Sequence, residues 1–340
     1  MSEVSIVGLD LAKNAFQAHG ARADGSVAFR KKLRRGQLLA VFASLPRSVV
    51  AMEACASARY WGREIGALGH EIRLIPPIYV KPFVKRQKND AADAEAIAEA
   101  ASRATMRFVA VKSAEKQAAS MAFRTRDLLV RQRTQSINAL RGHLAEFGVA
   151  APAGRAHCRR LEEAVEDPAT GLPDHVIELA RLLIAQVDRL SEKIAILDRE
   201  IRNRSQCDGV ASRLATIPGV GPITAAAMEA IAPPPETVSK GRDFAAWLGL
   251  TPRQHSTGGK DRLGRTSKMG QRNLRRLLII GAMAVLRWAA RNGAPEGSWL
   301  ARMMAKKPRM LVAVALANKT ARVAWALMAK GGVYRNPAAA

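Results

Sequence analysis

Four acidic residues in the first third of the chain have the positions that a metal-dependent phosphoryl-transfer site needs. Asp10 and Glu53 each end a run of apolar residues with the pattern of a buried β-strand. Asp90 and Asp93 are three residues apart at the start of a helical segment, so their side chains share one face. Carboxylate oxygens are the ligands that Mg²⁺ prefers, and a pair of such ions activates an attacking oxygen and stabilises a leaving one. Convergence of the four carboxylates at one sheet end would make a Mg²⁺ site.

Each of these acids also has an ordinary structural explanation. Asp10 fits a turn, Glu53 fits a solvent-facing strand position, and Asp90 fits a helix N-cap. Asp93 is favoured in the first turn of a helix by the helix dipole. Their joint placement at strand ends and at one helix start, in a chain otherwise rich in cations, favours the metal site.

A second set of reactive side chains lies in residues 253–270, which are rich in glycine, hydroxyls and cations. A hydroxyl among Arg and Lys side chains suits attack on a phosphodiester, because the cations stabilise the developing charge. Ser256 is the candidate nucleophile, and the alternative is a hydrogen-bonding loop residue. We expect nucleic-acid contacts from Arg253, Lys260, Arg262, Arg265, Lys268, Arg272, Arg275 and Arg276.

The segment Ile217–Ala225 resembles the turn of a helix-hairpin-helix motif. Glycines at 219 and 221 would let backbone N–H groups approach phosphate oxygens, and the N-terminus of the following helix favours an anion. The alternative is a plain glycine-rich turn between two helices. We expect nucleic-acid contacts from Gly219, Gly221 and Thr224.

The elements that must position the four acids alternate between strand and helix patterns. The predicted strands are Val4–Asp10, Ala15–Ala21, Ser26–Leu33, Ser48–Glu53 and Glu71–Ile75, and the predicted helices are Gln37–Leu45, Ser57–Leu68 and Asp90–Ser102. Three strands followed by alternating helices and strands predict a mixed α/β sheet of ribonuclease H-like order, in which the fourth strand lies beside the first. A Rossmann domain is disfavoured because no Gly-x-Gly-x-x-Gly follows the first strand.

The middle of the chain predicts two long helices. Residues 113–148 repeat an apolar side chain every seven positions, and arginines that include Arg124 and Arg131 cover the remaining surface. That surface is either a solvated face or a contact for a nucleic-acid backbone. Residues 149–174 contain prolines and glycines and predict a connector. Residues 176–201 have an a/d seam over more than three heptads, which predicts an antiparallel coiled-coil arm that also serves in oligomerisation.

The composition indicates a nucleic-acid partner. The 340 residues include 54 Lys and Arg against 29 Asp and Glu, a net charge of +25. Residues 240–310 alone contain 16 Lys and Arg against three acids, and such clustering suits phosphate binding. Aromatic residues are only 5% of the chain, so phosphate contact should dominate over base stacking. This charge argues against an enzyme of small-molecule metabolism.

The sequence predicts neither a membrane protein nor a secreted one. The longest apolar run, Leu277–Leu286, is about half of the ~20 residues that a spanning helix needs, and the N-terminus lacks the pattern of a signal peptide. The three cysteines are far apart and form no Cys-x-x-Cys motif, which argues against a zinc ribbon or a disulfide framework. We expect a cytoplasmic, nucleoid-associated protein.

Several of these motifs together resemble a known family. They are Gly8–Lys13, Met52–Cys55, Lys88–Ala94, Ile217–Ala225 and Leu248–Arg276. In this order and spacing they resemble the DEDD transposases of insertion-sequence family 110, over residues 4–330. No single motif is decisive, but the ordered set is specific.

The resemblance implies a domain organisation and a mechanism. It implies a RuvC-like domain in residues 1–110, a coiled-coil arm in 111–206 and a C-terminal transposase domain in 207–340. It implies that Asp10, Glu53, Asp90 and Asp93 bind Mg²⁺, and that a serine becomes transiently linked to DNA. It also implies guidance by a structured RNA of the element, double-stranded donor and target DNA as partners, and a dimer or tetramer.

The position of the serine departs from the family pattern. The family's serine commonly stands directly before the first glycine of the loop, where this chain has Thr257. Spacing from the Ser267-Lys268 pair indicates Ser256 instead, so Ser256 is the first candidate and Thr257 the second. Two other classes remain open, which are a metal-only structure-specific nuclease of the Holliday-junction resolvase type and a non-catalytic nucleic-acid scaffold.

Overall fold

A five-stranded mixed sheet forms the centre of the N-terminal unit, Met1–Glu115. The computed structural model describes residues 4–85 and 89–335, so Lys88 of the Lys88–Ala94 motif lies outside the described residues. The strand order is β3-β2-β1-β4-β5; β1, β2 and β3 are antiparallel, and β4 and β5 run parallel to β1. The strands are β1 (Ile6–Asp10), β2 (Ala15–Ala21), β3 (Val27–Arg34), β4 (Val49–Glu53) and β5 (Glu71–Ile75). This is the mixed order expected, with the fourth strand beside the first.

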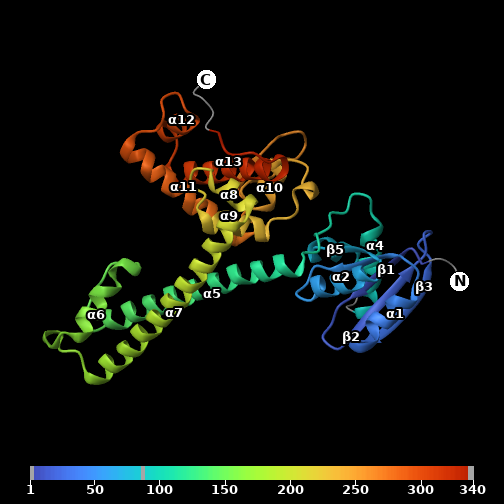
Figure 1. Ribbon diagram of the computed structural model, residues 1–340, viewed down its shortest axis with the longest axis horizontal. Helices are drawn as coiled ribbons and strands as arrows, with labels where there is room; N and C mark the ends of the chain where they lie inside the picture. The colour runs from blue at the N-terminus through green and yellow to red at the C-terminus, as the bar shows by residue number, and fades with distance from the viewer. Residues whose placement is uncertain (1–3, 86–88, 336–340) are drawn as a thin grey trace. The chain divides into compact units, whose positions relative to one another are not determined.

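Helices pack on both faces of this sheet (Figure 1). They are α1 (Leu38–Ser44), α2 (Ala58–Ala67), α3 (Pro77–Val80) and α4 (Asp90–Ser102). Side chains alternate along β1, so Val7 and Leu9 join the core with α1 and α2, whereas Gly8 faces α4. The core on the α4 side is built from smaller residues, among them Ala51 and Ala96. The face that carries α4 therefore has short side chains next to the candidate site.

Two long antiparallel helices, α5 (Ala114–Ala145) and α7 (Asp174–Cys207), begin the second unit, Lys116–Ala340 (Figure 1). Contacts between the two helices join successively later residues of α5 to successively earlier residues of α7. Arg126 bonds Asp198, Arg133 Nη1 donates to Ser191 Oγ at 3.3 Å, and Ile137 packs near Val187. Five residues of the a/d seam are buried between the helices and their neighbours: Ala180, Val187, Leu190, Ile194 and Ile201. The seam is thus satisfied largely within one chain.

The segment expected to be only a connector contains a helix, α6 (Cys158–Glu166). Leu161 and Val165 are buried with Leu140 and Leu144 of α5. The sequence did not predict this helix because the helix is short and its apolar face spans only two turns. Prolines and glycines on both sides of it dominate the local pattern. The expectation of a plain connector over residues 149–174 was wrong on this point.

The rest of the second unit is a helical core with one hairpin. Its elements are α8 (Gly209–Ala215), α9 (Pro222–Ile231), α10 (Gly241–Trp247), β6 (Pro252–Gln254), β7 (Leu263–Thr266), α11 (Arg272–Asn292), α12 (Trp299–Lys306) and α13 (Arg309–Lys330). Buried side chains of α8–α11 and α13 form one core with the start of α5 and the end of α7. The division between an arm and a C-terminal domain at residue 206 stays a prediction. Residues 4–85 and 89–335 also contain five short 3-10 turns: Arg35–Gln37, Lys81–Phe83, Arg155–His157, Pro168–Thr170 and Pro235–Thr237.

One helix, α13, is long and apolar enough to cross a membrane by length and composition alone. Its residues Val312, Ala317 and Ala324 are buried in the core, and the helix packs on α10 and α11. Within the described part of the chain, 28% of its apolar window is buried, so packing accounts for only part of its hydropathy.

Candidate active site

Asp10 and Glu53 are the last residues of two neighbouring strands inside the N-terminal sheet, β1 and β4. The parallel pairing of β1 with β4 sets Gly8 opposite Ala51 and Leu9 opposite Met52, and Asp10 and Glu53 are the next residues of the two strands. Because side chains alternate along a strand, Asp10 shares the face of Gly8 and Glu53 shares the face of Ala51. Both acids are therefore on the face that α4 covers, and both are half-buried.

Helix α4 approaches this face unusually closely because β1 has a glycine there. A Cβ atom on Gly8 would overlap the carbonyl oxygen of Ala94 and would lie 2.6 Å from the amide nitrogen of Ala98. The helix is rich in alanine, which keeps its own side chains short. The small residues of both elements let the first turn of α4 come close to the end of β1.

Three carboxylates meet at this point. One oxygen of each of Asp10, Asp90 and Asp93 lies within 4.8 Å of the others, although Asp10 is eighty residues away in the sequence. Asp90 is exposed and the other two are half-buried. Glu53 is not part of this group in the described structure, although it ends the neighbouring strand on the same face. Three of the four acids expected to converge thus do so, and the fourth lies at the same sheet edge.

Helix α4 is held at both its start and its side. The Asn89 side chain caps the helix by accepting a hydrogen bond of 3.0 Å from the Ala91 amide. Glu95 forms ion pairs with Lys85 at 2.7 Å and with Arg30 of β3 at 2.9 Å. The hydrogen bond from Lys85 lowers the pKa of Glu95. These contacts fix the register of the helix on the sheet, and so the position of its acidic first turn.

The expected serine loop is a β-hairpin, formed by β6 and β7. Its turn is Thr257-Gly258-Gly259-Lys260, closed by backbone bonds of 3.3 and 3.0 Å between Thr257 and Lys260. The two central glycines have φ of 55° and 75°, the positive values that a type I′ turn needs. Ser256 therefore stands just before a tight turn, directly across from Asp261.

The Ser256 hydroxyl is fully hydrogen-bonded although the residue is exposed. Its Oγ donates to Asp261 Oδ1 at 3.0 Å. It accepts from Gln254 Nε2 and from the backbone amide of Arg262, each at 3.2 Å. These bonds are those of a hydrogen-bonding loop residue, the alternative considered from the sequence, and the role of Ser256 as nucleophile stays a prediction.

Most of the expected nucleic-acid contacts are exposed cations on or beside the hairpin. They are Arg253, Lys260, Arg262, Arg265, Lys268, Arg272 and Arg276. Exposed guanidinium and ammonium groups on one short stretch of chain can bind successive phosphates. Gly221 is exposed at the N-cap of α9, and Arg124 and Arg131 are exposed on α5.

Three expected contact residues have packing roles in this structure. Thr224 is buried, with 7% of its surface exposed. A Cβ on Gly219 would lie 2.8 Å from the Gly281 carbonyl oxygen, so Gly219 serves the close packing of this turn on α11. Arg275 Nη1 donates to the carbonyl oxygens of Leu248 at 2.9 Å and Met269 at 3.3 Å. These packing contacts do not test binding, so contacts of Gly219, Thr224 and Arg275 with nucleic acid stay predictions.

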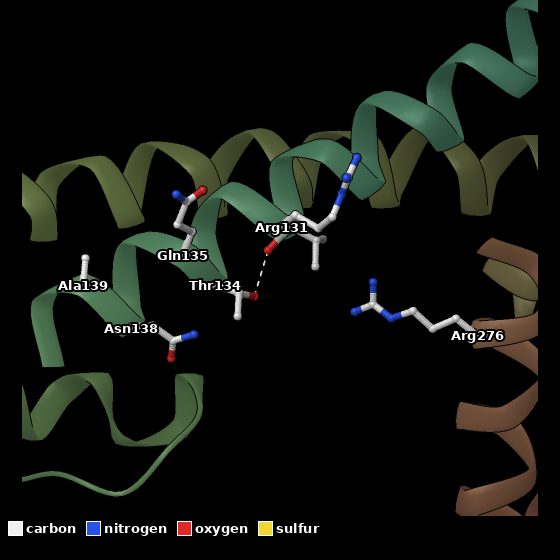
Figure 2. A pocket seen from close by; sticks show the side chains of 7 residues that line it. Arg131, Thr134, Gln135, Asn138, Ala139 and Arg276 are labelled. Atoms are coloured by element: carbon white, nitrogen blue, oxygen red, sulfur yellow. Dashed lines mark hydrogen bonds between the residues drawn. The ribbon is translucent and has the colours of Figure 1, made fainter. Parts of the chain in front are cut away.

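An open hollow of about 590 Å³ lies between α5 and α11. Figure 2 shows Arg276 of α11 extending toward α5, whose Arg131, Gln135 and Asn138 line the other side. Asp127 of α5 bonds both arginines, at 3.3 Å to Arg131 and 3.2 Å to Arg276. The hollow thus presents two arginines and two side-chain amides, with the arginines held by one shared carboxylate.

Comparison with known proteins identifies the family of the chain. Residues 211–295 match the profile of the Transposase IS116/IS110/IS902 family, and residues 7–148 match that of the DEDD transposases of the IS110 type. A protein of Pseudomonas aeruginosa named "Probable family 20 transposase" is 49% identical, covering 98% of this chain and 99% of its own. The chain belongs to the IS110 family of transposases.

Two further relatives of this IS110-family transposase carry the names of insertion sequences. The transposase for insertion sequence element IS1328 of Yersinia enterocolitica is 40% identical, over 98% of this chain and 99% of its own length. The transposase for insertion sequence element IS1111A of Coxiella burnetii is 37% identical, over 98% and 92%. The IS110-family chain is therefore a DNA-processing enzyme, and DNA is its partner.

The two matched regions of the IS110-family transposase contain the two sets of reactive groups. The DEDD match over residues 7–148 includes the carboxylates, and the match over 211–295 includes the hairpin with Ser256. Transposases of the DEDD family normally use divalent metal ions. Sequence reasoning missed Asp261 and Asp127, because each is a single acid whose partners only the fold brings near. A lone acid among cations, as at Asp261, was the available signal.

Proposed function

We propose that this transposase catalyses Mg²⁺-dependent cleavage and exchange of DNA strands through a transient phosphoserine link. Asp10, Glu53, Asp90 and Asp93 would bind the metal, and Ser256 would be the nucleophile. The observation that carries the proposal is the meeting of Asp10 with the first turn of α4, which sets three carboxylate oxygens within 4.8 Å of one another.

The donor set fits a divalent magnesium ion. Three carboxylates at the end of β1, with a fourth on the adjacent strand, supply only hard oxygen ligands, and neither thiol nor imidazole belongs to the group. Bound there, Mg²⁺ would orient the scissile phosphate and stabilise the charge on its oxygens. The half-burial of Asp10 and Asp93 and the packing of α4 hold the ligands in place before substrate arrives.

The Ser256 hydroxyl supplies the attacking oxygen in the proposed reaction. Its Oγ attacks phosphorus, the bond from phosphorus to the 3′-oxygen breaks, and the strand end leaves as a 3′-hydroxyl. A 3′-hydroxyl of another strand later attacks the serine ester and regenerates the Ser256 hydroxyl. The cleaved DNA strand is never released from the protein, because its phosphate stays bound to Ser256 between the two steps. Thr257, the next residue, is the second candidate for the same role.

The positive surface of the second unit supports the proposed nucleic-acid partners. We infer that donor and target DNA contact the exposed cations of the hairpin and α11, together with Gly221, and that Arg124 and Arg131 of α5 extend this surface. A guide RNA from the element is the further proposed partner, and the large net charge suits a protein that binds both polymers. A dimer or tetramer, working in the cytoplasm at the nucleoid, completes the proposal.

Two variants test the proposed chemistry. The protein is purified with its co-purifying RNA and incubated with Mg²⁺ and labelled DNA that carries the element ends. Ser256→Ala and Asp10→Ala should each abolish excision and integration but leave DNA binding within about twofold, because each removes one reacting group. Thr257→Val is the matched control and should recombine normally.

The outcomes separate the competing functions. Cleavage by Ser256→Ala and Thr257→Val alike, without a covalent adduct, would indicate a metal-only nuclease of the Holliday-junction resolvase type. Loss of activity in Thr257→Val with normal recombination by Ser256→Ala would move the nucleophile to Thr257. A protein that binds DNA but never cleaves it with Mg²⁺ would be a scaffold, which would contradict the proposal.

A further inference from the structure

We propose that Asp261 positions the Ser256 hydroxyl and accepts its proton during attack on DNA. The inference rests on the proposed role of Ser256 as the nucleophile. No feature of the sequence pattern assigned a role to Asp261. It is the single acid in residues 253–276, a stretch with eight Lys and Arg. An acid at this place weakens phosphate binding by the surrounding cations, so it needs a compensating function.

The hydrogen bonds of Ser256 direct its proton to one place. A serine hydroxyl has one donor and two acceptor positions. Gln254 Nε2 and the Arg262 amide occupy the acceptor positions, so the hydroxyl proton points to Asp261 Oδ1, at 3.0 Å. The distance lies within the range required of a general base.

The hairpin keeps this pair in register. The Thr257–Lys260 turn is closed by backbone hydrogen bonds, and the residues flanking it, Ser256 and Asp261, stand opposite each other. The amide of His255 donates to the Arg262 carbonyl at 2.8 Å, which adds a further rung behind the pair. The Ser256–Asp261 contact is therefore set by backbone geometry as well as by side-chain choice.

The proton and the electron pairs balance in both steps. As the Ser256 Oγ forms its bond to phosphorus, its proton passes to Asp261 Oδ1. The bond from phosphorus to the 3′-oxygen breaks with its electron pair on that oxygen, which then takes a proton from water. One of the two N–H groups on Oγ, from Gln254 or Arg262, leaves as phosphorus approaches that lone pair, and the other remains hydrogen-bonded to Oγ. When a 3′-hydroxyl attacks the serine ester, its proton passes to water, the bond from phosphorus to Oγ breaks, and Asp261 returns its proton to the departing Oγ.

The test measures the rate at which Ser256 becomes covalently linked to DNA. Wild type, Asp261→Asn and Asp261→Glu are incubated with Mg²⁺, co-purifying RNA and labelled DNA from pH 5.5 to 9. The adduct is then followed as a protein band that stays labelled in detergent. Asp243→Asn, which changes the acid in the first turn of α10, is the matched control. DNA binding and the thermal midpoint are measured on every variant to separate chemistry from folding.

We expect Asp261→Asn to form the adduct about 10²–10⁴-fold more slowly, the range typical for loss of a general base. Its remaining rate should rise tenfold per pH unit, because hydroxide from solvent then removes the proton, whereas the wild-type profile is flatter. Asp261→Glu should recover part of the rate, since it restores a carboxylate. The thermal midpoint should match that of Asp243→Asn, and DNA binding should be no weaker, because Asp261→Asn removes a negative charge from among the cations.

Three results would overturn the inference. An Asp261→Asn adduct rate equal to wild type would do so, and so would a slower rate with the pH profile of wild type, which indicates a purely structural role. Failure of Asp261→Glu to exceed Asp261→Asn would also count against it. If wild type itself forms no adduct at Ser256, the proposed function fails instead, so the two failures are distinguishable.

Discussion

At the scale of single residues, Arg272 and Arg275 of α11 lie in different surroundings. Arg275 is half-buried, and its guanidinium donates to two carbonyl oxygens in the segment that leads into the helix. Burial lowers the pKa of this guanidinium. Arg272, one turn earlier, is exposed. The sequence predicts both arginines as nucleic-acid contacts from their charge, and the fold leaves Arg272 the more exposed of the two.

This difference predicts opposite effects of two alanine substitutions. Arg275→Ala should lower the free energy of unfolding by about 1–3 kcal/mol, because it removes the donor to the carbonyl oxygens of Leu248 and Met269 and the packing of a half-buried side chain. Arg272→Ala should leave stability within about 0.5 kcal/mol and weaken DNA binding. Denaturant unfolding and DNA titration on both variants measure this. Equal stability losses in the two variants would contradict the assignment.

At the scale of elements, the packing of α4 on β1 builds the carboxylate group. The strand brings Asp10 and the helix brings Asp90 and Asp93, and Gly8 sets the separation between the two. Since β1 and α4 run in opposite directions, Gly8 meets the middle of the helix while Asp10 meets its start. The metal site therefore depends on the absence of a side chain at Gly8.

Gly8→Ala should push α4 away from the sheet. We expect a loss of about 1–3 kcal/mol in unfolding free energy, the usual cost of overpacking, together with loss of Mg²⁺-dependent cleavage. Gly36→Ala is the matched control, because a Cβ there meets no atom within 4 Å. Urea unfolding and Mg²⁺ titration of both variants measure the effect. Normal cleavage by Gly8→Ala would show that the approach of α4 is not required.

At the scale of the whole molecule, the net charge is unevenly distributed. Residues 1–115 contain 18 Lys and Arg against 11 acids, whereas residues 116–340 contain 36 against 18. Part of the second set is neutralised inside the helix pair, for example where Arg126 bonds Asp198. The hairpin and α11 keep most of their cations exposed. Phosphate binding should therefore concentrate on that part of the second unit.

The affinity for DNA should fall steeply as salt rises, because cationic side chains that bind phosphates release counterions from the polymer. Replacing Arg262 and Arg265 with Gln should reduce the slope of log affinity against log salt by about 1 for each phosphate that is no longer bound. Arg159→Gln on α6, whose side chain is exposed and pairs with Glu163, is the control and should leave the slope unchanged. A slope unaffected by the double change would place the phosphates elsewhere.

The sequence alone determined the elements of the N-terminal sheet and their order. The strands Ala15–Ala21 and Glu71–Ile75 and the helix Asp90–Ser102 have the bounds that the sequence predicted. Alternating apolar residues and turn residues act over a few positions, so the local pattern was sufficient. The N-cap of the helix is Asn89 and not Asp90, the residue that the sequence suggested. The ordered motifs likewise identified the family, which the comparisons confirmed.

Only the tertiary structure decided which groups meet. It joined Asp10 to Asp90 and Asp93, left Glu53 beside that group, and set Asp261 against Ser256. It also packed the backbone of Gly219 closely against the backbone of Gly281. These outcomes depend on strand register, on a tight turn and on close backbone approach. Such interactions join residues that have no shared local pattern, so their consequences for chemistry become visible only in the folded chain.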